Sequence, residues 1–215
     1  MKKKVTIIDI GSGNILSIKR AFEKWNAEVE ITYQKEKILS ASRLVLPGVG
    51  AFKNAIDKLN SKNFCELIPE IKLKEIPLLG ICLGMQLFFD ESEEFGKFKG
   101  LSLIKGKVKK LPISSLNRER LKIPSIGWHK LILEEKAFSF KAGKFFKNFN
   151  TQDQFYFVHS YCARPKEKDV ILASYNFGGH LIPSIVAENN IIGCQFHPEK
   201  SGPFGLNLIN NFISL

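Results

Sequence analysis

The segment Pro77-Leu78-Leu79-Gly80-Ile81-Cys82-Leu83-Gly84-Met85-Gln86 decides how this chain is expected to fold. A short apolar run leads to a cysteine flanked by glycines at positions 80 and 84, and a second apolar run follows. This order predicts a buried strand, a sharp turn and a helix, which is the arrangement of a hydrolase nucleophile elbow with sulfur in place of the usual hydroxyl. The glycines permit the close backbone approach that such a turn requires. Cys82 is therefore a candidate nucleophile.

A second segment, Gln195-Phe196-His197-Pro198-Glu199-Lys200, supplies a candidate base. Pro198 biases His197 toward an extended conformation, in which residues i and i+2 share a face. His197 and Glu199 are thus predicted to lie side by side, with the carboxylate orienting the imidazole toward the sulfur of Cys82. The two segments together predict a cysteine hydrolase triad. A lone cysteine or histidine is more often structural, so the prediction depends on their co-occurrence.

Length and composition favour one globular domain covering residues 1–215. The chain has 215 residues, of which 44% are hydrophobic, enough for one core and too few for two ordinary domains. No apolar run reaches the length of a membrane span, and the start of the chain lacks a signal peptide, so a cytoplasmic protein without membrane contact is expected. Cys65, Cys162 and Cys194 are scattered, which predicts no disulfide framework, no metal and no cofactor.

The net charge of +11 raises the question of nucleic-acid binding. The densest basic cluster is formed by Lys105, Lys107, Lys109 and Lys110, but no interleaved aromatic residues or recognised nucleic-acid motif accompany it. We therefore expect no nucleic acid as a partner and interpret the cluster as a basic docking surface for an acidic partner.

The distribution of apolar runs predicts an α/β fold. In the first half, expected strands over 5–10, 29–33, 43–46 and 78–81 alternate with helices over 14–25 and 51–59, which is typical of βαβ units and a parallel sheet. After Gly100, strands are expected in close succession over 101–104, 108–111, 128–133, 154–158, 170–175, 184–188 and 191–195, with a closing helix over 202–213. A mostly parallel sheet flanked by helices, with antiparallel strands added in the second half, follows.

Two glycine-containing loops follow predicted strands. Gly11-Ser12-Gly13 resembles the start of a dinucleotide fingerprint, but Leu16 occupies the position of the third glycine, so this reading fails and Asn14 is interpreted as a helix N-cap. Pro47-Gly48-Val49-Gly50 is either a plain tight turn or a loop that aims a backbone N–H into a cleft. In the second case, the N–H groups of Val49 and Leu83 are candidates for an oxyanion hole.

The motifs, taken in order along nearly the whole chain, resemble the triad class of glutamine amidotransferases and, more narrowly, the glutaminase subunit of imidazole glycerol phosphate synthase. The resemblance rests on residues 47–50 (PGVG), 80–86 (GICLGMQ), 92–94 (SEE), 100–108 (GLSLIKGKV), 156–161 (YFVHSY) and 195–201 (QFHPEKS). It implies a flavodoxin-like class I glutamine amidotransferase fold. It also implies hydrolysis of glutamine to glutamate, with ammonia passing to a (β/α)₈-barrel cyclase subunit that makes imidazole glycerol phosphate and aminoimidazole carboxamide ribotide.

The resemblance assigns roles to individual residues. It implies that Cys82 is the nucleophile, His197 the general base and acid, and Glu199 the orienting group. It implies that the Gly48–Val49 peptide switches the oxyanion hole when the partner is engaged. The residues implied to bind glutamine are Gly50, Gln86, Glu94, Ser160 and Tyr161. The residues implied to lie at the partner interface are Lys200, Trp128, Tyr156 and His159.

Two segments depart from the family's common pattern, and they leave the identity of the partner subunit undetermined. The first loop, commonly DYGMGN, is DIGSGN over residues 9–14, and the common HMGWN is SIGWH over 125–129. Both segments face the partner in the family. The nearest alternative is therefore a paralogous subunit that supplies ammonia for amidination of a surface sugar. A stand-alone cysteine hydrolase and a non-catalytic binding protein are further alternatives, and the intact triad argues against the latter.

Overall fold

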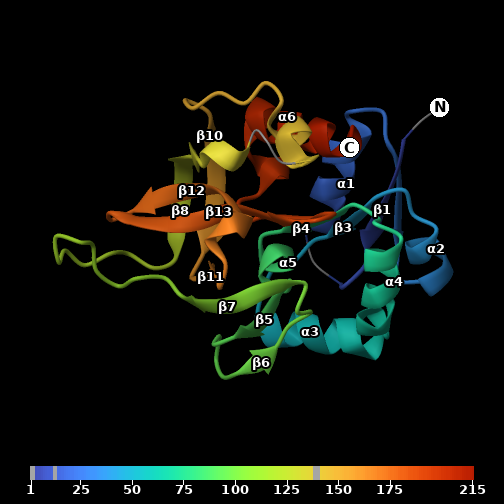
Figure 1. Ribbon diagram of the computed structural model, residues 1–215, viewed down its shortest axis with the longest axis horizontal. Coiled ribbons are helices and arrows are strands. Elements are labelled where there is room, and N and C mark those ends of the chain that lie inside the picture. Colours follow the sequence, from blue (N-terminus) through green and yellow to red (C-terminus); the bar gives the residue numbers. More distant parts are fainter. Residues whose placement is uncertain (1–2, 12–13, 138–140) are drawn as a thin grey trace.

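The computed structural model describes residues 3–11, 14–137 and 141–215, so Ser12 and Gly13 of the first predicted loop lie outside the described residues. An eight-stranded sheet with the strand order β2-β1-β3-β4-β14-β13-β12-β9 crosses the molecule (Figure 1). Five strands pair in parallel: β2 Glu28–Thr32, β1 Lys4–Ile8, β3 Leu44–Leu46, β4 Leu78–Ile81 and β14 Ile191–Cys194. Three antiparallel strands follow: β13 His180–Glu188, β12 Ile171–Phe177 and β9 Ile132–Leu133. This sheet confirms the predicted fold class.

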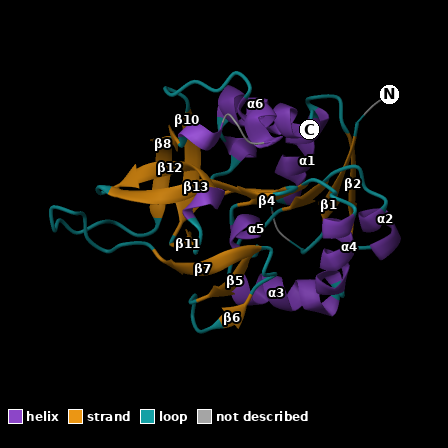
Figure 2. Ribbon diagram, viewed as in Figure 1, coloured by secondary structure: helices purple, strands orange, loops and turns teal. Residues whose placement is uncertain are grey.

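Helices cover both faces of the large sheet (Figure 2). On one face lie α1 Ile15–Glu23 and α6 Gly202–Ile213, whose Phe22 and Phe212 rings contact each other at 6.3 Å. The other face carries α2 Lys35–Leu39, α3 Phe52–Ser61 and α4 Ile68–Leu73. Each helical layer seals a separate apolar core against the sheet. The predicted helix over 202–213 is confirmed, whereas α2 and α4 were not predicted because five or six residues are too few to show helical periodicity.

Two smaller sheets are attached to the second half of the chain. A four-stranded sheet in the order β11-β7-β5-β6 consists of β11 Tyr161–Pro165, β7 Ile104–Lys110, β5 Phe89–Ser92 and β6 Phe98–Lys99. A two-stranded sheet pairs β8 Ser125–Lys130 with β10 Gln154–His159. The strands predicted over 101–104 and 108–111 are wrong as separate elements, because one strand, β7, runs from 104 to 110 and residues 101–103 lie before it. The strand predicted over 128–133 is also wrong as a single element, because it divides into β8 and β9.

The basic cluster on β7 is largely neutralised within the chain. Lys105, Lys107 and Lys109 form ion pairs with Asp90, Glu91 and Glu93 at 3.2, 2.8 and 3.2 Å, respectively. The lysines alternate along β7, whereas Asp90 and Glu91 are consecutive on β5 at a register shift, so β5 showed no alternating apolar pattern. The interpretation of these lysines as a docking surface for an acidic partner is corrected accordingly.

The remaining short helical segments shape the loops. They are α5 Leu83–Gln86 and the 3₁₀ turns Phe64–Leu67, Glu135–Ala137, Lys141–Phe146, Lys168–Val170 and Pro198–Lys200. None of the helices in the described part of the chain combines the length and apolar character that a bilayer crossing needs. The two segments that matter for the site are α5, directly after β4, and the turn Pro198–Lys200, directly after β14.

Candidate active site

Cys82 sits at a strained turn between β4 and α5, as the sequence predicted. Its backbone has φ 55° and ψ −108°, a region that residues with a side chain seldom adopt. The turn is tight because backbones approach closely: a Cβ on Gly84 would lie 1.9 Å from the carbonyl oxygen of Leu46. A Cβ on Gly80 would lie 2.5 Å from the ring of Phe88. The flanking glycines therefore permit the elbow, and the fold holds the strained cysteine in place.

Pairing of β4 with β14 brings the two sequence segments together. Ile81 is in register with Cys194, and the Cys82 N–H donates to the Cys194 carbonyl at 2.8 Å. Because the strands are parallel, their carboxyl ends emerge at the same edge of the sheet. The residues that follow Cys194, up to His197, are thereby carried alongside Cys82, although more than a hundred positions separate them in sequence.

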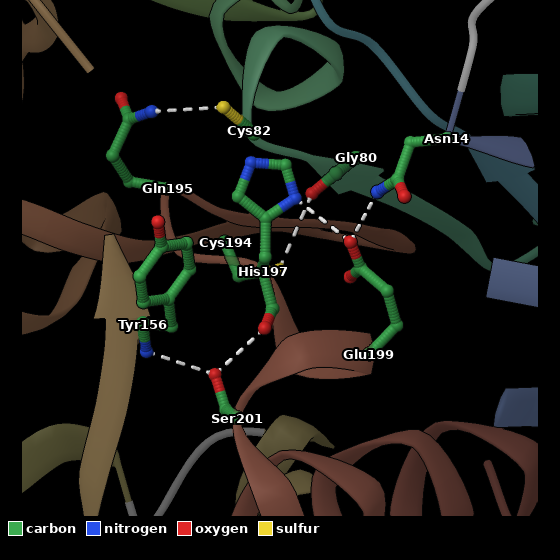
Figure 3. A network of polar contacts seen from close by, with 9 residues as sticks. All are labelled: Asn14, Gly80, Cys82, Tyr156, Cys194, Gln195, His197, Glu199 and Ser201. Atoms are coloured by element: carbon green, nitrogen blue, oxygen red, sulfur yellow. Dashed lines mark hydrogen bonds and ion pairs between the residues drawn. The ribbon is translucent and has the colours of Figure 1, made fainter. Parts of the chain in front are cut away.

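His197 and Glu199 form a buried pair. Nδ1 of His197 donates to Oε1 of Glu199 at 2.8 Å, and the two side chains are 2% and 0% exposed. The other ring nitrogen lies on the side of Cys82 (Figure 3). Burial alone lowers the pKa of His197, but hydrogen bonding and charge from Cys82 and Glu199 more than offset it and raise the pKa to about 10. A histidine held between a cysteine and a buried glutamate is the arrangement expected of a Cys-His-Glu triad.

Asn14 has a different role from the predicted one. It occupies the N-cap position of α1, but its side chain makes no capping hydrogen bond. Instead, Nδ2 of Asn14 donates to Oε1 of Glu199, the oxygen that also accepts from His197 (Figure 3). Asn14 therefore stands at the predicted N-cap position, but its side-chain amide donates to a buried carboxylate, which needs donors more than a helix end that water can reach. Oε2 of Glu199 is buried without a partner among the described residues.

Ser201 ties the segment that follows β14 to strand β10. Its hydroxyl donates to the carbonyl of His197 at 2.6 Å and accepts from the N–H of Tyr156 at 3.0 Å. The N–H of His197 in turn donates to the carbonyl of Tyr156 at 2.9 Å. These three bonds fix the backbone of His197 on both sides, and Figure 3 shows the two made by the Ser201 hydroxyl. Sequence reasoning quoted Ser201 within a motif but gave it no role.

A pocket of about 330 Å³ opens above the cysteine. It brings together the nucleophile, the base, both oxyanion candidates and all five residues predicted to bind glutamine. Its lining consists of Val49, Gly50, Cys82, Leu83, Gln86, Glu94, Pro124, Val158, His159, Ser160, Tyr161 and His197. A larger hollow of about 560 Å³ lies beside the loop over 113–123, but it contains neither nucleophile nor base. The smaller pocket is therefore the candidate active site.

Two of the predicted glutamine ligands are fixed by hydrogen bonds within the chain. Nε2 of Gln86 donates to the carbonyl of Tyr161 at 2.9 Å and to Oε1 of Gln195 at 3.0 Å. Oε2 of Glu94 accepts from the N–H of Phe52 at the start of α3, at 2.6 Å. Both side chains are therefore preorganised at the pocket wall. Neither must be ordered by a ligand, which lowers the entropy cost of binding.

The oxyanion candidates occupy facing loops. Leu83 is the first residue of α5, where a helix leaves the N–H without an acceptor in its own backbone. The loop after β3 packs directly against this point, since a Cβ on Gly48 would lie 2.8 Å from the backbone nitrogen of Gly84. Val49 follows at the pocket wall, and Gly50 has φ +96°, a conformation that favours glycine. Val49 and Leu83 thus lie on segments that pack against each other at the pocket.

Three of the four predicted interface residues lie at the surface around this pocket, and one does not. Trp128 is 50% exposed and packs edge-on against Tyr156 at 5.8 Å, while Lys200 is exposed. His159 is only 6% exposed. Its Nδ1 donates to the carbonyl of Tyr161 at 2.8 Å, and its Nε2 accepts from the hydroxyl of Tyr175 at 2.9 Å. The prediction of His159 as an interface residue is corrected, because both ring nitrogens are used inside the protein.

Two of the residues on β8 that differ from the family pattern, Ser125 and His129, contact each other. Ser125 and His129 contact each other through Oγ and Nε2 at 3.4 Å. The ring of His129 also packs against Tyr175 at 4.6 Å and Phe157 at 5.5 Å, and burial lowers its pKa. Ser125 is buried and His129 is half-buried on the inner side of β8, whereas Ile126 is exposed, and this strand keeps its pairing with β10.

Sequence reasoning missed a residue that touches the nucleophile. Nε2 of Gln195 lies 3.7 Å from Sγ of Cys82, and the side chain is completely buried. Its position two residues before His197 in an extended segment was the available signal, because such residues share a face. No group of three or more His, Cys, Asp or Glu side chains suited to a metal occurs within the described ranges.

Comparisons with known proteins agree with this geometry. The family model described as Glutamine amidotransferase class-I matches residues 6–215. Imidazole glycerol phosphate synthase subunit HisH 1 of Legionella pneumophila (strain Philadelphia 1) is 41% identical over 211 residues, covering 98% of this chain and 99% of that relative. Subunit HisH of Lactococcus lactis is 42% identical over 211 residues, covering 98% of both. The solved structure of PurLQS from Thermotoga maritima matches with a TM-score of 0.73 at 16% identity, covering 100% of this chain and 98% of that one, a likeness of fold.

Proposed function

Because this chain belongs to the class-I glutamine amidotransferase family and, within it, to the HisH subunits of imidazole glycerol phosphate synthase, we propose that it is the glutaminase subunit of such a synthase. It hydrolyses glutamine to glutamate and delivers ammonia for imidazole glycerol phosphate formation in histidine biosynthesis, a cytoplasmic pathway. The observation that carries the proposal is the meeting of Cys82 with the buried His197–Glu199 pair at one pocket. The relatives' shared name over their full length favours this pathway over amidination of a surface sugar.

The proposed reaction begins with attack of the Cys82 thiolate on the side-chain carbonyl carbon of glutamine. The carbonyl electron pair moves onto oxygen, where the N–H groups of Val49 and Leu83 stabilise it. When the C–N bond breaks, the imidazolium of His197 gives its proton to the leaving nitrogen, so that ammonia departs and a glutamyl thioester remains. Glu199 keeps the imidazole in the required tautomer throughout.

The second half of the reaction releases glutamate. The neutral His197 takes a proton from water, and the oxygen of that water adds to the thioester carbon. Collapse of this intermediate breaks the C–S bond, and its electron pair returns to the sulfur of Cys82. The raised pKa of His197 supports this cycle, since the charge on its imidazolium is balanced by Glu199 and the thiolate.

Glutamine is held in this proposal by the pocket wall around Gln86. Glu94 is the carboxylate partner of the substrate's α-ammonium group, because it is an acidic side chain at that wall. The backbone around Ser160 and Tyr161 supplies polar contacts for the substrate's α-carboxylate, together with Gly50 on the opposite side. These roles follow the family resemblance residue by residue, and their common position in one pocket supports them.

The partner in this proposal is a (β/α)₈-barrel cyclase subunit that docks over the mouth of the pocket. Ile126, Trp128, Tyr156 and Val158 form what we call the β8–β10 face, since directly paired residues two apart share one side of a sheet. Ile126 and Trp128 are 59% and 50% exposed, and Val158 lines the pocket. An exposed apolar face that runs to the pocket supports a covering partner. Lys200 adds a positive charge at its border.

The first prediction tests this function directly. The purified chain, mixed with the cyclase subunit from the same organism, is expected to release glutamate from glutamine faster than it does alone. Cys82→Ser is expected to reduce release to background and to abolish covalent labelling by diazo-oxo-norleucine. Cys65→Ser, which changes a partly exposed cysteine outside the pocket, is the matched control and is expected to behave as wild type. Glutamate release that is absent with the cyclase, or equal in Cys82→Ser, would refute the proposal.

A further inference from the structure

The side chain of Gln195 reaches the nucleophile from a different side than His197 does (Figure 3). Gln195 follows the last residue of β14 and is 0% exposed. Its N–H donates to the carbonyl of Ser184 on β13 at 2.8 Å, which anchors its backbone to the sheet. Its Nε2 lies 3.7 Å from Sγ of Cys82, within the range of a hydrogen bond to sulfur. The proposed glutaminase reaction does not use this contact between Gln195 and Cys82.

A backbone carbonyl fixes which end of the Gln195 amide faces the sulfur. The carbonyl of Tyr161 can only accept hydrogen bonds, so the Gln86 atom 2.9 Å away must be the NH₂ group. The same NH₂ group lies 3.0 Å from the Gln195 amide, so that Gln195 atom must be the acceptor oxygen. The Gln195 NH₂ is then the group that faces Cys82. The Tyr161 carbonyl thus determines which atom donates and which accepts in each hydrogen bond from Gln86 to Gln195 and on to Cys82. The assignment does not depend on a choice of side-chain rotamer.

The Tyr161 carbonyl oxygen also accepts a hydrogen bond from a second side chain, that of His159. Nδ1 of His159 lies 2.8 Å from the Tyr161 oxygen and must therefore carry a proton, which leaves Nε2 to accept from the Tyr175 hydroxyl at 2.9 Å. Burial lowers the pKa of His159 to about 4, so the ring is neutral at physiological pH, as this pattern of donors requires. Tyr175 and Gln86 are 0% and 5% exposed, so water does not compete for these groups.

We propose that Gln195 is a catalytic residue that donates a hydrogen bond to the sulfur of Cys82, with Gln86 and the Tyr161 carbonyl holding the donor in place. The proposal rests on the proposed glutaminase function and adds a participant to its site. The donor acts twice in the cycle: before the thiolate attacks, and when the C–S bond breaks and its electron pair returns to sulfur. Both are points at which the sulfur bears negative charge, and donors to charged atoms form the stronger hydrogen bonds.

The second prediction tests this donor through the chemistry of the thiol. In a Cys65→Ala background, the alkylation rate of Cys82 by iodoacetamide is measured across a pH series. Gln195→Met keeps a side chain of similar length without a donor, and we expect alkylation at neutral pH to slow by about tenfold or more, with the pH profile displaced to higher pH. Burial raises the pKa of Cys162 to about 11 and raises the pKa of Cys194 well above its ordinary value, so these thiols contribute little.

Two further variants separate this role from packing. Gln195→Glu has the same shape and still accepts from Gln86, but burial beside the sulfur raises the pKa of its carboxyl. At the alkaline end of the pH series, where this carboxyl is ionised and repels the thiolate, alkylation is expected to slow at least as much as in Gln195→Met. Ser184→Ala removes a buried polar group from the neighbouring strand β13, where its hydroxyl donates to the carbonyl of Ile182 at 3.1 Å. This control is expected to alkylate at the wild-type rate. If Gln195→Met fails to fold, the alkylation rate of Gln195→Glu tests the proposal by itself.

The outcomes of this experiment and of the glutaminase assay are separable. If both Gln195 variants fold, as judged by thermal unfolding, and alkylate at the wild-type rate with an unchanged pH profile, the proposal is wrong even though wild-type glutamate release stands. If alkylation depends on Gln195 while the wild-type chain with its cyclase releases no glutamate, the donor role stands and the glutaminase function is refuted.

Discussion

At the scale of single residues, the orientation of His197 depends on how one carboxylate is held. Oε1 of Glu199 accepts from both His197 and Asn14, while Oε2 is buried without a partner in the described part of the chain. A buried carboxylate with so few donors is costly, and each remaining donor contributes more than it would at a surface. Asn14 therefore acts through Glu199 as a positioning residue for the imidazole.

The third prediction concerns this residue. Asn14→Ala removes one of the donors to the buried carboxylate, and kcat for glutamate release with the cyclase is expected to fall about tenfold or more, with KM little changed. KM is spared because Asn14 does not line the pocket. Asn14→Asp, which brings a second carboxylate to Glu199, is expected to lose more activity. Asn54→Ala on the exposed side of α3 is the control. Full kcat in Asn14→Ala would show that the contact is not used.

At the scale of elements, the elbow depends on the close packing of the end of β3 against the start of α5. The glycine at position 84 allows this packing, since any side chain there would meet the carbonyl of Leu46. The same packing sets the distance between the loop that carries Val49 and the first N–H of α5. The proposed oxyanion hole is thus built by a contact between two elements rather than by one motif.

The fourth prediction follows from this contact. Gly84→Ala places a Cβ 1.9 Å from the oxygen of Leu46, so β3 and α5 must separate, and the free energy of unfolding is expected to fall by about 2–3 kcal/mol. Gly202→Ala is the matched control, because its Cβ meets no atom within 4 Å and its φ of +59° is the only strain, costing about 1 kcal/mol. Denaturant unfolding of both variants measures the difference. Equal losses would contradict the packing argument.

At the scale of the whole molecule, two buried histidines give opposite dependences of stability on pH. Burial lowers the pKa of His159 from 6.5 to about 4, so the unfolded chain binds the extra proton between these values and stability falls as pH drops from about 6.5 to about 4. Interactions with Cys82 and Glu199 raise the pKa of His197 from 6.5 to about 10 despite its burial. Its contribution is complete below pH 6.5 and is lost as pH rises toward 10.

The fifth prediction tests the loss of stability that His159 causes at acidic pH. His159→Gln keeps a donor and an acceptor but does not titrate, so its loss of stability between pH 6.5 and 4 should be shallower than that of the wild type by up to about 1.4 kcal/mol per pH unit. Carboxylates that titrate in this range are common to both proteins and cancel in the comparison. Denaturant unfolding at a series of pH values provides the measurement, and parallel curves would contradict a buried, neutral His159.

The agreement between sequence and structure is best where a pattern is local. The strand over 78–81 and the helix over 202–213 were predicted with their observed limits, because a continuous apolar run and an amphipathic segment report burial directly. The elbow at Cys82 and the pairing of His197 with Glu199 were also predicted, because each depends on neighbours within a few residues. The unpredicted elements are short or, like β5, charged and therefore carry no such pattern.

The sequence by itself determined the α/β class, the cysteine elbow, the histidine–glutamate pair and the family that these motifs mark. Only the tertiary structure decided what holds them: that Asn14 donates to a carboxylate 185 positions away, and that Gln195 meets a sulfur 113 positions away. It also decided that His159 turns inward. The physical reason is that these contacts depend on how segments far apart in the chain pair and pack, as β4 does with β14, and a local pattern of residues does not encode that pairing.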